Sequence, residues 1–543
     1  MSLSAGTVLS GLGVGLNAVV APVFKVAPAA ALPAWSKTTN NPDNEVAALK
    51  EAIKFVGDYL DELGVKAGGT SAEIFDALKM LMEDDELFEI ASDHISQGWS
   101  AGAGYGMAVN EMGELLGSDP VFAARVDDLQ DLSRRVQARL AGISLGLELP
   151  TEGKFVIVGD DFSPADTAQF TPAVVGVITI KGGPTSHTAI ICRSRSIPAV
   201  VSCGDAAGLT NGDQVLVDPV GDRVLVGGEI SSATQALSFT AVSAEPIIPV
   251  RSNIGSVADA VTASATAAEG VGLFRTELLY LSATSEPSVE QQADSYAEAL
   301  AAAPQGPIVV RTIDAGSDKP VPFLNMGHEE NPSLGVRGYR LIVEHRSFIE
   351  NQLKALEVAR EKTGREVWVM APMIATVAEA REFAGIARAL GKFKVGIMVE
   401  TPSIAATMSD LAGVVDFISV GTNDLSQYLF AADRMNPALG ALLNPWQPAL
   451  IRTLERIATG AAEANVSSGV CGESASDPAF AVVLAGLGMK SVSASPSQVT
   501  AVRNALSAVT IEQAREIAAI ALKATTAEEA KTSVTAALAD LTA

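Results

Sequence analysis

Basic residues, histidine and cysteine are all scarce in this sequence. Lysine and arginine number 38 against 63 aspartates and glutamates, and the net charge of −25 argues against nucleic acid as a partner. The same charge fits ordinary solubility or a basic protein partner. Cys192, Cys203 and Cys471 form no disulfide framework and no CxxC pair, which favours a reducing environment. We therefore expect a soluble, cytoplasmic protein that does not bind nucleic acid.

Long apolar runs are also missing. No uninterrupted apolar stretch reaches the length of a transmembrane helix, so we expect no membrane insertion. The first 24 residues, MSLSAGTVLSGLGVGLNAVVAPVF, are apolar enough to raise the question of a signal peptide. They have no basic start, and glycines interrupt them, so we interpret them as strands and turns of the first domain.

The chain changes character several times along its 543 residues, a length that suggests three or four domains. Short apolar strands broken by glycines come first, long amphipathic helices follow, and short strands then return. This order predicts a helical unit inserted into one α/β domain. The expected boundaries are 1–30 with 145–226 for the α/β domain, 31–144 for the helical unit, and 227–245 for a small, polar linker.

The helical unit is expected to contain two long amphipathic helices, EVAALKEAIKFVGDYLDELG (45–64) and SAEIFDALKMLMEDDELFEIASDHI (71–95). The second carries a run of acids: Glu83, Asp84, Asp85, Glu86 and Glu89. Such a run is most often a solvated face. An alternative is a docking site for a basic partner.

Residues 246–543 show a different rhythm, in which apolar runs alternate with helical stretches. The runs are IIPVRSN, GVGLFRTE, IVVRTID, VWVMAPMI, KVGIMVETP, DFISVGTND, SSGVCGES and KSVSAS. Eight strand–helix repeats in this length predict a (β/α)8 TIM barrel.

The stretch 181–195, KGGPTSHTAIICRSR, contains one of only four histidines. It follows an apolar run at 174–180 that reads as a buried strand. Gly182 permits a tight turn, Ser186 is a good N-cap, and His187 then falls in the first turn of a short helix. Free N–H groups and the helix dipole favour an anion there. A neutral imidazole could accept a phosphoryl group at this place, although a capped polar turn with no such role has the same spacing.

Polar residues follow the ends of the expected barrel strands, where barrel active sites lie. They are Arg275, Arg311, Lys319, Arg337, Glu400, Asn423, Asp424, Arg434, Cys471 and Glu473. Guanidiniums bind phosphate and carboxylate in a forked geometry, and a carboxylate pair suits Mg²⁺. Each residue alone could be structural, since arginines often form salt bridges and a buried cysteine is commonly a small hydrophobe. Together they fit a small anion such as phosphoenolpyruvate.

The motif GGPTSHTAIICRS resembles the phosphohistidine signature of enzymes that take phosphate from phosphoenolpyruvate: enzyme I of the bacterial sugar phosphotransferase system, pyruvate phosphate dikinase and phosphoenolpyruvate synthase. The segments GVGLFRTELLY, VVRTIDAGSDKP, ENPSLGVRGYR, GIMVETPS, FISVGTNDLSQY and VCGESASDP are similar, in order, to the barrel of enzyme I. The resemblance covers roughly the whole chain.

This resemblance implies a role for each matching residue. His187, in a swivelling domain, would be phosphorylated, supported by Thr167 and Arg193. Phosphoenolpyruvate would be bound by Arg275, Arg311, Lys319, Arg337, Asn423, Asp424 and Arg434; Glu400 and Asp424 would hold Mg²⁺, and Cys471 would protonate the enolate so that pyruvate leaves.

The resemblance also implies partners. The helical unit would dock the phosphocarrier HPr through the acids Glu83, Asp84 and Glu86, in the first step of sugar uptake. The barrel would form a homodimer. The linker at 227–245 is shorter and plainer than the helical connector of the family, so it departs from the family at the expected hinge.

Three other functions compete with this interpretation. A dikinase or synthase would need a nucleotide-binding domain, and no glycine-rich phosphate loop precedes the histidine region. A non-catalytic sensor would be expected to have lost His187, Arg275, Glu400 or Asp424, and all four are present. A lone barrel lyase or aldolase would leave the histidine domain without a role.

Overall fold

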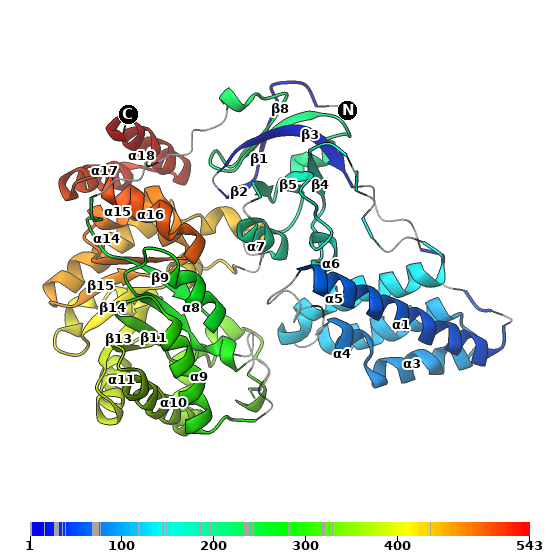
Figure 1. Ribbon diagram of the computed structural model, residues 1–543, viewed down its shortest axis with the longest axis horizontal. Coiled ribbons are helices and arrows are strands. Elements are labelled where there is room, and N and C mark those ends of the chain that lie inside the picture. Colours follow the sequence, from blue (N-terminus) through cyan, green and yellow to red (C-terminus); the bar gives the residue numbers. More distant parts are fainter. Residues whose placement is uncertain are drawn as a thin grey trace. The chain divides into compact units, whose positions relative to one another are not determined.

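The computed structural model describes most of the chain. The described residues are 3–15, 17–26, 32–34, 36–38, 40–67, 75, 78–117, 120–143, 146–147, 149–150, 152–183, 186–195, 197–232, 239, 244–280, 283, 285–316, 321–324, 326–327, 329–434 and 436–542. The chain divides into two compact units, Met1–Ala236 and Leu237–Ala543, so the division falls within the linker expected at 227–245 (Figure 1). Within the described ranges, no helix is both long and apolar enough to cross a membrane.

The first unit contains an eight-stranded mixed sheet in the order β1-β8-β7-β3-β4-β5-β6-β2. Its strands are β1 (Val8–Ser10), β2 (Leu12–Val14), β3 (Val19–Lys25), β4 (Phe155–Gly159), β5 (Val174–Thr179), β6 (Ala199–Val201), β7 (Gln214–Asp218) and β8 (Arg223–Val226). β3 pairs in parallel with β4, although more than a hundred residues separate them in sequence. The helical region is therefore an insertion between two neighbouring strands, as the sequence predicts.

The insertion is built from α1 (Pro42–Ala67), α3 (Asp85–Ser96), α4 (Ala101–Gly117) and α5 (Pro120–Leu140). The expected single helix over 71–95 is wrong. Residues 78–82 are helical, the helix stops at Glu83–Asp84, and α3 starts at Asp85. The side chain of Asp84 accepts hydrogen bonds from the N–H groups of Glu86 and Leu87, at 2.9 and 3.2 Å. This acid is an N-cap, which starts a new helix where the apolar periodicity alone indicates continuity.

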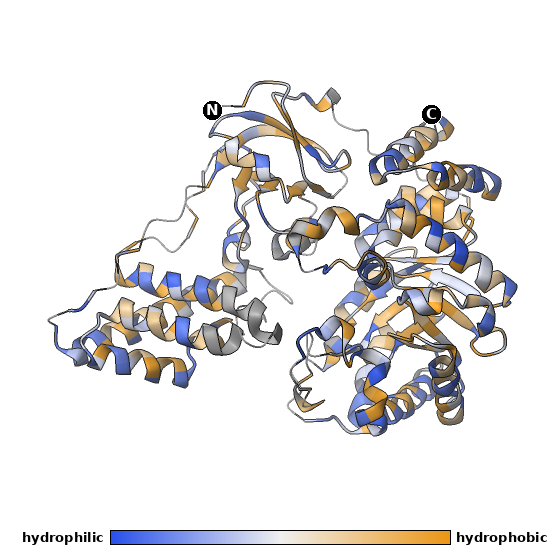
Figure 2. Cartoon of the chain, turned by 180° about the vertical axis from the view of Figure 1, so that it is seen from behind, coloured by the Kyte–Doolittle hydropathy of each residue, from blue (hydrophilic) through white to orange (hydrophobic). Residues whose placement is uncertain are grey.

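The second unit confirms the predicted barrel: eight parallel strands close in the order β9 to β16. They are β9 (Val250–Ile254), β10 (Val271–Arg275), β11 (Ile308–Arg311), β12 (Val367–Ala371), β13 (Lys394–Val399), β14 (Phe417–Val420), β15 (Ser467–Val470) and β16 (Ser491–Ala494). Each lies in one of the eight apolar runs identified in the sequence. Figure 2 shows hydrophobic residues concentrated on these strands, while the surrounding helices carry both kinds.

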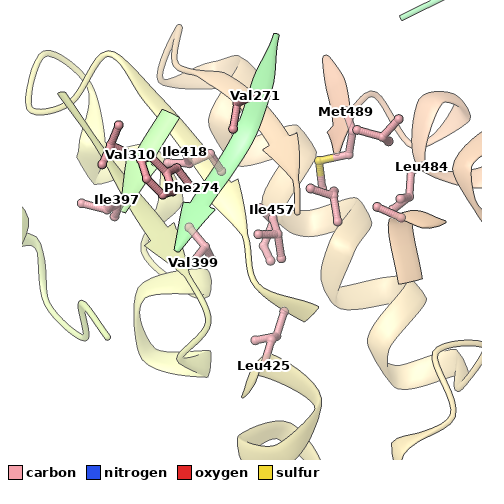
Figure 3. Close-up of a cluster of buried hydrophobic side chains, with 14 of the residues drawn as sticks. Val271, Phe274, Val310, Ile397, Val399, Ile418, Leu425, Ile457, Leu484 and Met489 are labelled. Carbon is pink, nitrogen blue, oxygen red and sulfur yellow. The ribbon is translucent and has the colours of Figure 1, made fainter. Parts of the chain in front are cut away.

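The helices of the second unit form its main core together with the strands. They are α8 (Val257–Ser264), α9 (Val289–Ala302), α10 (Ile342–Thr363), α11 (Val377–Leu390), α12 (Pro402–Ala405), α13 (Thr422–Phe430), α14 (Pro448–Glu463), α15 (Pro478–Gly486), α16 (Val499–Ser507), α17 (Ile511–Lys523) and α18 (Ala527–Thr542). Side chains such as Phe274, Val310 and Ile418 are buried in this core together with Leu425 and Ile457 (Figure 3). The connection between β13 and β14 has no long helix, because α12 consists of a single turn.

Candidate active site

His187 is the first residue of α7 (His187–Ser194), as its sequence context predicts. The hydroxyl of Ser186 caps the helix by accepting a hydrogen bond from the N–H of Ala189 at 3.3 Å. Gly182 has φ +77°, a left-handed conformation that favours glycine. The backbone of His187 therefore lies in the first helical turn, where the dipole and free N–H groups favour an anion.

Asp161 fixes the helix start from the opposite side. The Thr188 hydroxyl donates to Asp161 Oδ1 at 2.5 Å, and the N–H of Phe162 donates to the same oxygen at 2.9 Å. A Cβ at residue 182 would lie 2.5 Å from Asp161 Oδ2. The turn before His187 thus packs directly on this carboxylate, which the sequence motif did not single out. Its partner Thr188 is 27 residues away in sequence, so no local pattern indicated this contact.

Thr167 and Arg193 have different surroundings. Thr167 ends the short helix α6 (Pro164–Thr167) and is buried. Arg193 is exposed near the end of α7. It is Arg195 that donates from Nη1 to the carbonyl of Thr167, at 3.2 Å. The structure therefore connects α7 to α6 through Arg195, a residue that the motif did not indicate.

The barrel residues gather at the carboxyl ends of its strands. Arg275 ends β10 and Arg311 ends β11. Glu400 directly follows β13, and Asp424 lies in the first turn of α13, after β14. The predicted rim is therefore formed by one end of the barrel. Lys319 lies outside the described residues.

Arg337 is the centre of this rim and is only 1% exposed. Its Nε and Nη2 donate to the two carboxylate oxygens of Asp314, both at 3.0 Å. Its Nη1 and Nη2 donate to the two oxygens of Asp424, at 3.1 and 3.0 Å. Burial would lower the pKa of Arg337, but the two carboxylates outweigh it and raise that pKa. The guanidinium is thereby held as a cation between the two carboxylates.

Arg311 joins the same network through Asp314. Its Nη1 lies 3.0 Å from Asp314 Oδ2, and its Nη2 donates to Glu277 Oε1. Two buried atoms, Arg311 Nε and Glu277 Oε2, have no hydrogen-bond partner among the described residues. A buried polar atom without a partner is costly. An anionic ligand could accept a hydrogen bond from Arg311 Nε, whereas Glu277 Oε2 could be satisfied only by a donor.

Asp314 and Glu277 were not selected from the sequence, although both lie within quoted motifs. Asp314 is three residues after Arg311, and Glu277 is two residues after Arg275. The spacing of Asp314 after Arg311 is a detectable signal, because a buried guanidinium needs a carboxylate. Glu277 pairs with Arg311 rather than with its neighbour Arg275, so spacing alone would not have found that pair.

Glu400 and Asp424 have opposite electrostatics. Burial raises the pKa of Glu400 above its usual range, with repulsion from Asp424 and Asp314 as further causes, and Arg311 and Arg337 oppose this increase only in part. Burial also acts to raise the pKa of Asp424, but Arg337 and Arg434 outweigh it and lower that pKa. Arg434 Nη1 lies 3.7 Å from Asp424 Oδ1. A bound cation would offset the repulsion that Glu400 experiences from Asp424 and Asp314, and would favour its ionised form.

The donor set fits Mg²⁺ in part. Glu400 Oε1 already accepts the N–H of Met373 at 2.6 Å. Within the described residues, no group of three or more His, Cys, Asp or Glu side chains forms a complete metal site. Two carboxylates leave positions for water and substrate oxygens, which is how Mg²⁺ is commonly bound at phosphate sites. Glu400 and Asp424 could therefore hold the ion together with a phosphate ligand.

Cys471 follows β15 and lies inside the barrel, where it is 1% exposed. Burial raises its pKa to about 11, so the thiol stays protonated near neutral pH. Its Sγ donates weakly to the carbonyl of Val420 at 3.7 Å, and Asn253 Nδ2 holds the Cys471 carbonyl at 3.2 Å. A buried, protonated thiol at the strand ends can serve as an acid.

The remaining residues predicted from the sequence are Asn423 and the acids of the helical insertion. Asn423 Oδ1 accepts the N–H of Glu473 at 3.3 Å. Glu83, Asp84 and Glu86 are all exposed at the start of α3. This placement fits both a solvated face and a docking surface.

Comparison with known proteins gives matches along the whole chain. Three domains of the PEP-utilising enzyme family match this chain: the N-terminal domain matches residues 10–125, the mobile domain 151–220 and the PEP-binding domain 232–511.

Three curated relatives are called phosphoenolpyruvate-protein phosphotransferase. The one from Streptomyces coelicolor is 38% identical, over 98% of this chain and 99% of its own length. The one from Haloferax volcanii is 36% identical over 86% of each chain. The one from Bacillus subtilis is 31% identical over 96% of this chain and 98% of its own.

Proposed function

The chain belongs to the PEP-utilising enzymes, as a phosphoenolpyruvate-protein phosphotransferase, and from this premise we propose the residues, acceptor and product of its reaction. The phosphoryl group of phosphoenolpyruvate passes to His187 and then to a histidine of the phosphocarrier HPr, and pyruvate is released. This is the first step of phosphotransferase-system sugar uptake, carried out in the cytoplasm by a homodimer joined through its barrels.

The observation that carries the proposal is the buried charge network at the barrel mouth. Arg337 and Arg311 share Asp314, and Glu400 and Asp424 lie beside them. Fixed cations and carboxylates in a low-dielectric site stabilise charge without reorganisation during the reaction. Phosphoryl transfer depends mainly on such positioning and charge stabilisation.

The substrate's phosphate and carboxylate would be bound by Arg275, Arg311, Arg337 and Arg434, with Asn423 and Lys319. Mg²⁺ held by Glu400 and Asp424 would neutralise charge on the phosphate oxygens. The Nε2 atom of His187 attacks phosphorus in line, and the bond between phosphorus and the enol oxygen breaks. The enolate takes a proton at C3 from the Cys471 thiol, which gives pyruvate, and solvent restores that proton.

One histidine must serve two partners, so the α/β domain has to move between them. The segment 227–245 contains the division between the two compact units and is the proposed hinge. HPr would dock on the helical insertion, where Glu83, Asp84 and Glu86 attract a basic surface. Such attraction raises the association rate more than the affinity.

The test is transfer of label from ³²P-phosphoenolpyruvate with Mg²⁺, with and without HPr. Wild type, His187→Ala and the control His94→Gln are compared. We expect the wild type and the control to become labelled and His187→Ala to remain unlabelled. When HPr is added, the label should move from the labelled proteins to HPr. Label that stays on the protein would contradict HPr as the acceptor. No label on wild type that still binds phosphoenolpyruvate would favour a sensor.

A further inference from the structure

Gln352 is a fully buried amide on α10, at 0% exposure, and it lies behind the barrel mouth. Its Nε2 donates to Thr276 Oγ1 at 3.1 Å and to the Tyr296 hydroxyl at 2.9 Å. Its Oε1 accepts the N–H of Ile313 at 3.0 Å. One side chain therefore bonds to two strand ends and to helix α9.

The two strand-end partners lie among residues of the proposed site. Thr276 is between Arg275 and Glu277 in sequence, and its hydroxyl donates to the carbonyl of Arg311 at 2.8 Å. Ile313 directly precedes Asp314. Through Thr276, Gln352 is connected to the residue next to Glu277 and to the carbonyl of Arg311. Through Ile313, it is connected to the residue next to Asp314.

The strand ladder stops before these residues. The last paired residues of β10 and β11 are Arg275 and Arg311, and the pairing of β11 with β12 also ends at Arg311. Beyond this register the main chain needs other partners, since buried N–H groups are nearly always paired. Gln352 supplies the partner of Ile313 and anchors Thr276.

The orientation of the amide is fixed by a directed chain of hydrogen bonds. The Tyr280 hydroxyl donates to Gln292 Oε1 at 2.9 Å, so the Tyr296 hydroxyl donates to Tyr280. Tyr296 must then accept from Gln352 Nε2, and Oε1 faces the N–H of Ile313. An amide with a defined direction and three partners specifies geometry more strictly than an apolar side chain of equal volume.

We propose that Gln352 is a positioning residue for phosphoryl transfer, which holds the ends of β10 and β11 so that Arg311, Glu277 and Asp314 keep their arrangement. The inference rests on the proposed function. It predicts that the site-side bonds of this amide matter for catalysis, while its helix-side bond to Tyr296 matters for stability only.

The test compares Gln352→Met with Tyr296→Phe, by steady-state phosphoryl transfer from phosphoenolpyruvate to HPr and by thermal unfolding. Gln352→Met keeps the volume and loses both strand-end bonds. We expect kcat/KM for phosphoenolpyruvate to fall about ten- to a hundredfold, with kcat changing more than KM, because misplaced groups lose transition-state contacts. Tyr296→Phe leaves the Thr276 and Ile313 bonds in place and should keep kcat/KM within about twofold at a comparable loss of unfolding temperature.

Equal kinetic losses in both variants, in proportion to their unfolding temperatures, would assign Gln352 a structural role and overturn the inference. If Gln352→Met does not fold, the inference is tested at Thr276, the partner of Gln352. Thr276→Val should lose activity, while Thr276→Ser, which keeps the hydroxyl, should retain it. Equal activities of the two variants would overturn the inference. Label on wild type with normal Gln352→Met kinetics would overturn only the role of Gln352. An unlabelled wild type would overturn the proposed function and this inference with it.

Discussion

The barrel mouth and the histidine turn are built in opposite ways. At the mouth, Arg337 is held by two carboxylates and almost fully buried. At the turn, α7 has eight residues and an exposed arginine, and its start is held by a serine cap, a left-handed glycine and the uncharged partners of Asp161. The difference fits the proposed function: a rigid charged site suits the binding of a small anion, and a short helix end suits the proposed movement of His187 between two partners.

Replacing a central charge should give the largest effect. Arg337→Met removes the cation that Asp314 and Asp424 share and leaves each carboxylate with one remaining partner, Arg311 or Arg434. We expect the free energy of unfolding to fall by about 3–5 kcal/mol and phosphorylation to be lost. Arg193→Met at the turn removes an exposed cation and should change stability by less than about 0.5 kcal/mol. Chemical denaturation of both variants measures this. Similar values would mean that the two regions do not differ as proposed.

A second contrast concerns the cation. In Glu400→Gln we expect Mg²⁺ affinity, measured by calorimetric titration of the ion alone, to fall at least about tenfold, because the variant loses an anionic oxygen ligand. Glu473→Gln makes the same substitution at an exposed carboxylate after β15 and is the matched control. Unchanged binding in Glu400→Gln would exclude this carboxylate as a ligand.

The histidine turn should be sensitive to its backbone instead. Gly182→Ala forces a side chain into a left-handed conformation and against Asp161, so we expect a loss of about 1–3 kcal/mol and slower phosphorylation of His187. Gly183→Ala meets open space and should have little effect. Denaturant unfolding and rapid-quench labelling test the pair. Equal behaviour would argue against a strained turn.

The buried thiols of both units predict a common pH response. Burial raises the pKa of Cys471 and of Cys203 to about 11, and that of Cys192 to about 12. The native thiols therefore stay protonated when those of the unfolded chain ionise. This stabilising contribution is complete below about pH 8.5 and is lost as the pH rises through the folded values, at up to about 1.4 kcal/mol per thiol and pH unit. Denaturation midpoints from pH 8 to 10.5 should fall, less steeply in Cys192→Ala, and parallel slopes would refute the assignment.

The smallest effect is expected at the start of α3. Glu83→Gln with Glu86→Gln should slow HPr association a few-fold at low salt and leave labelling of His187 unchanged, since exposed charges act mainly on encounter. Asp84 stays unaltered because it caps the helix. Stopped-flow measurements at two salt concentrations test this, and an unchanged rate would identify the acids as a solvated face.

Much of the fold followed from local patterns. Each of the eight barrel strands lies in a run found by hydrophobicity, and His187 begins its helix where Ser186 caps it. The helix over 71–95 was misjudged because apolar periodicity continues across Glu83 and Asp84 while the cap interrupts the hydrogen bonds. Arg195 and Asp161 were missed for another reason: their partners, the Thr167 carbonyl and the Thr188 hydroxyl, are more than twenty residues away.

The sequence by itself determined the strand order of the barrel, the helical insertion and the residue types at the strand ends, because periodicity and turn chemistry are local. Only the tertiary structure decided which charges pair. Asp314, Asp424 and Arg337 come from three separate segments, and closure of the barrel brings an oxygen of each carboxylate within 3.1 Å of a guanidinium nitrogen of Arg337. Gln352 became visible in the same way, since a buried amide has a meaning only through the partners that folding places around it.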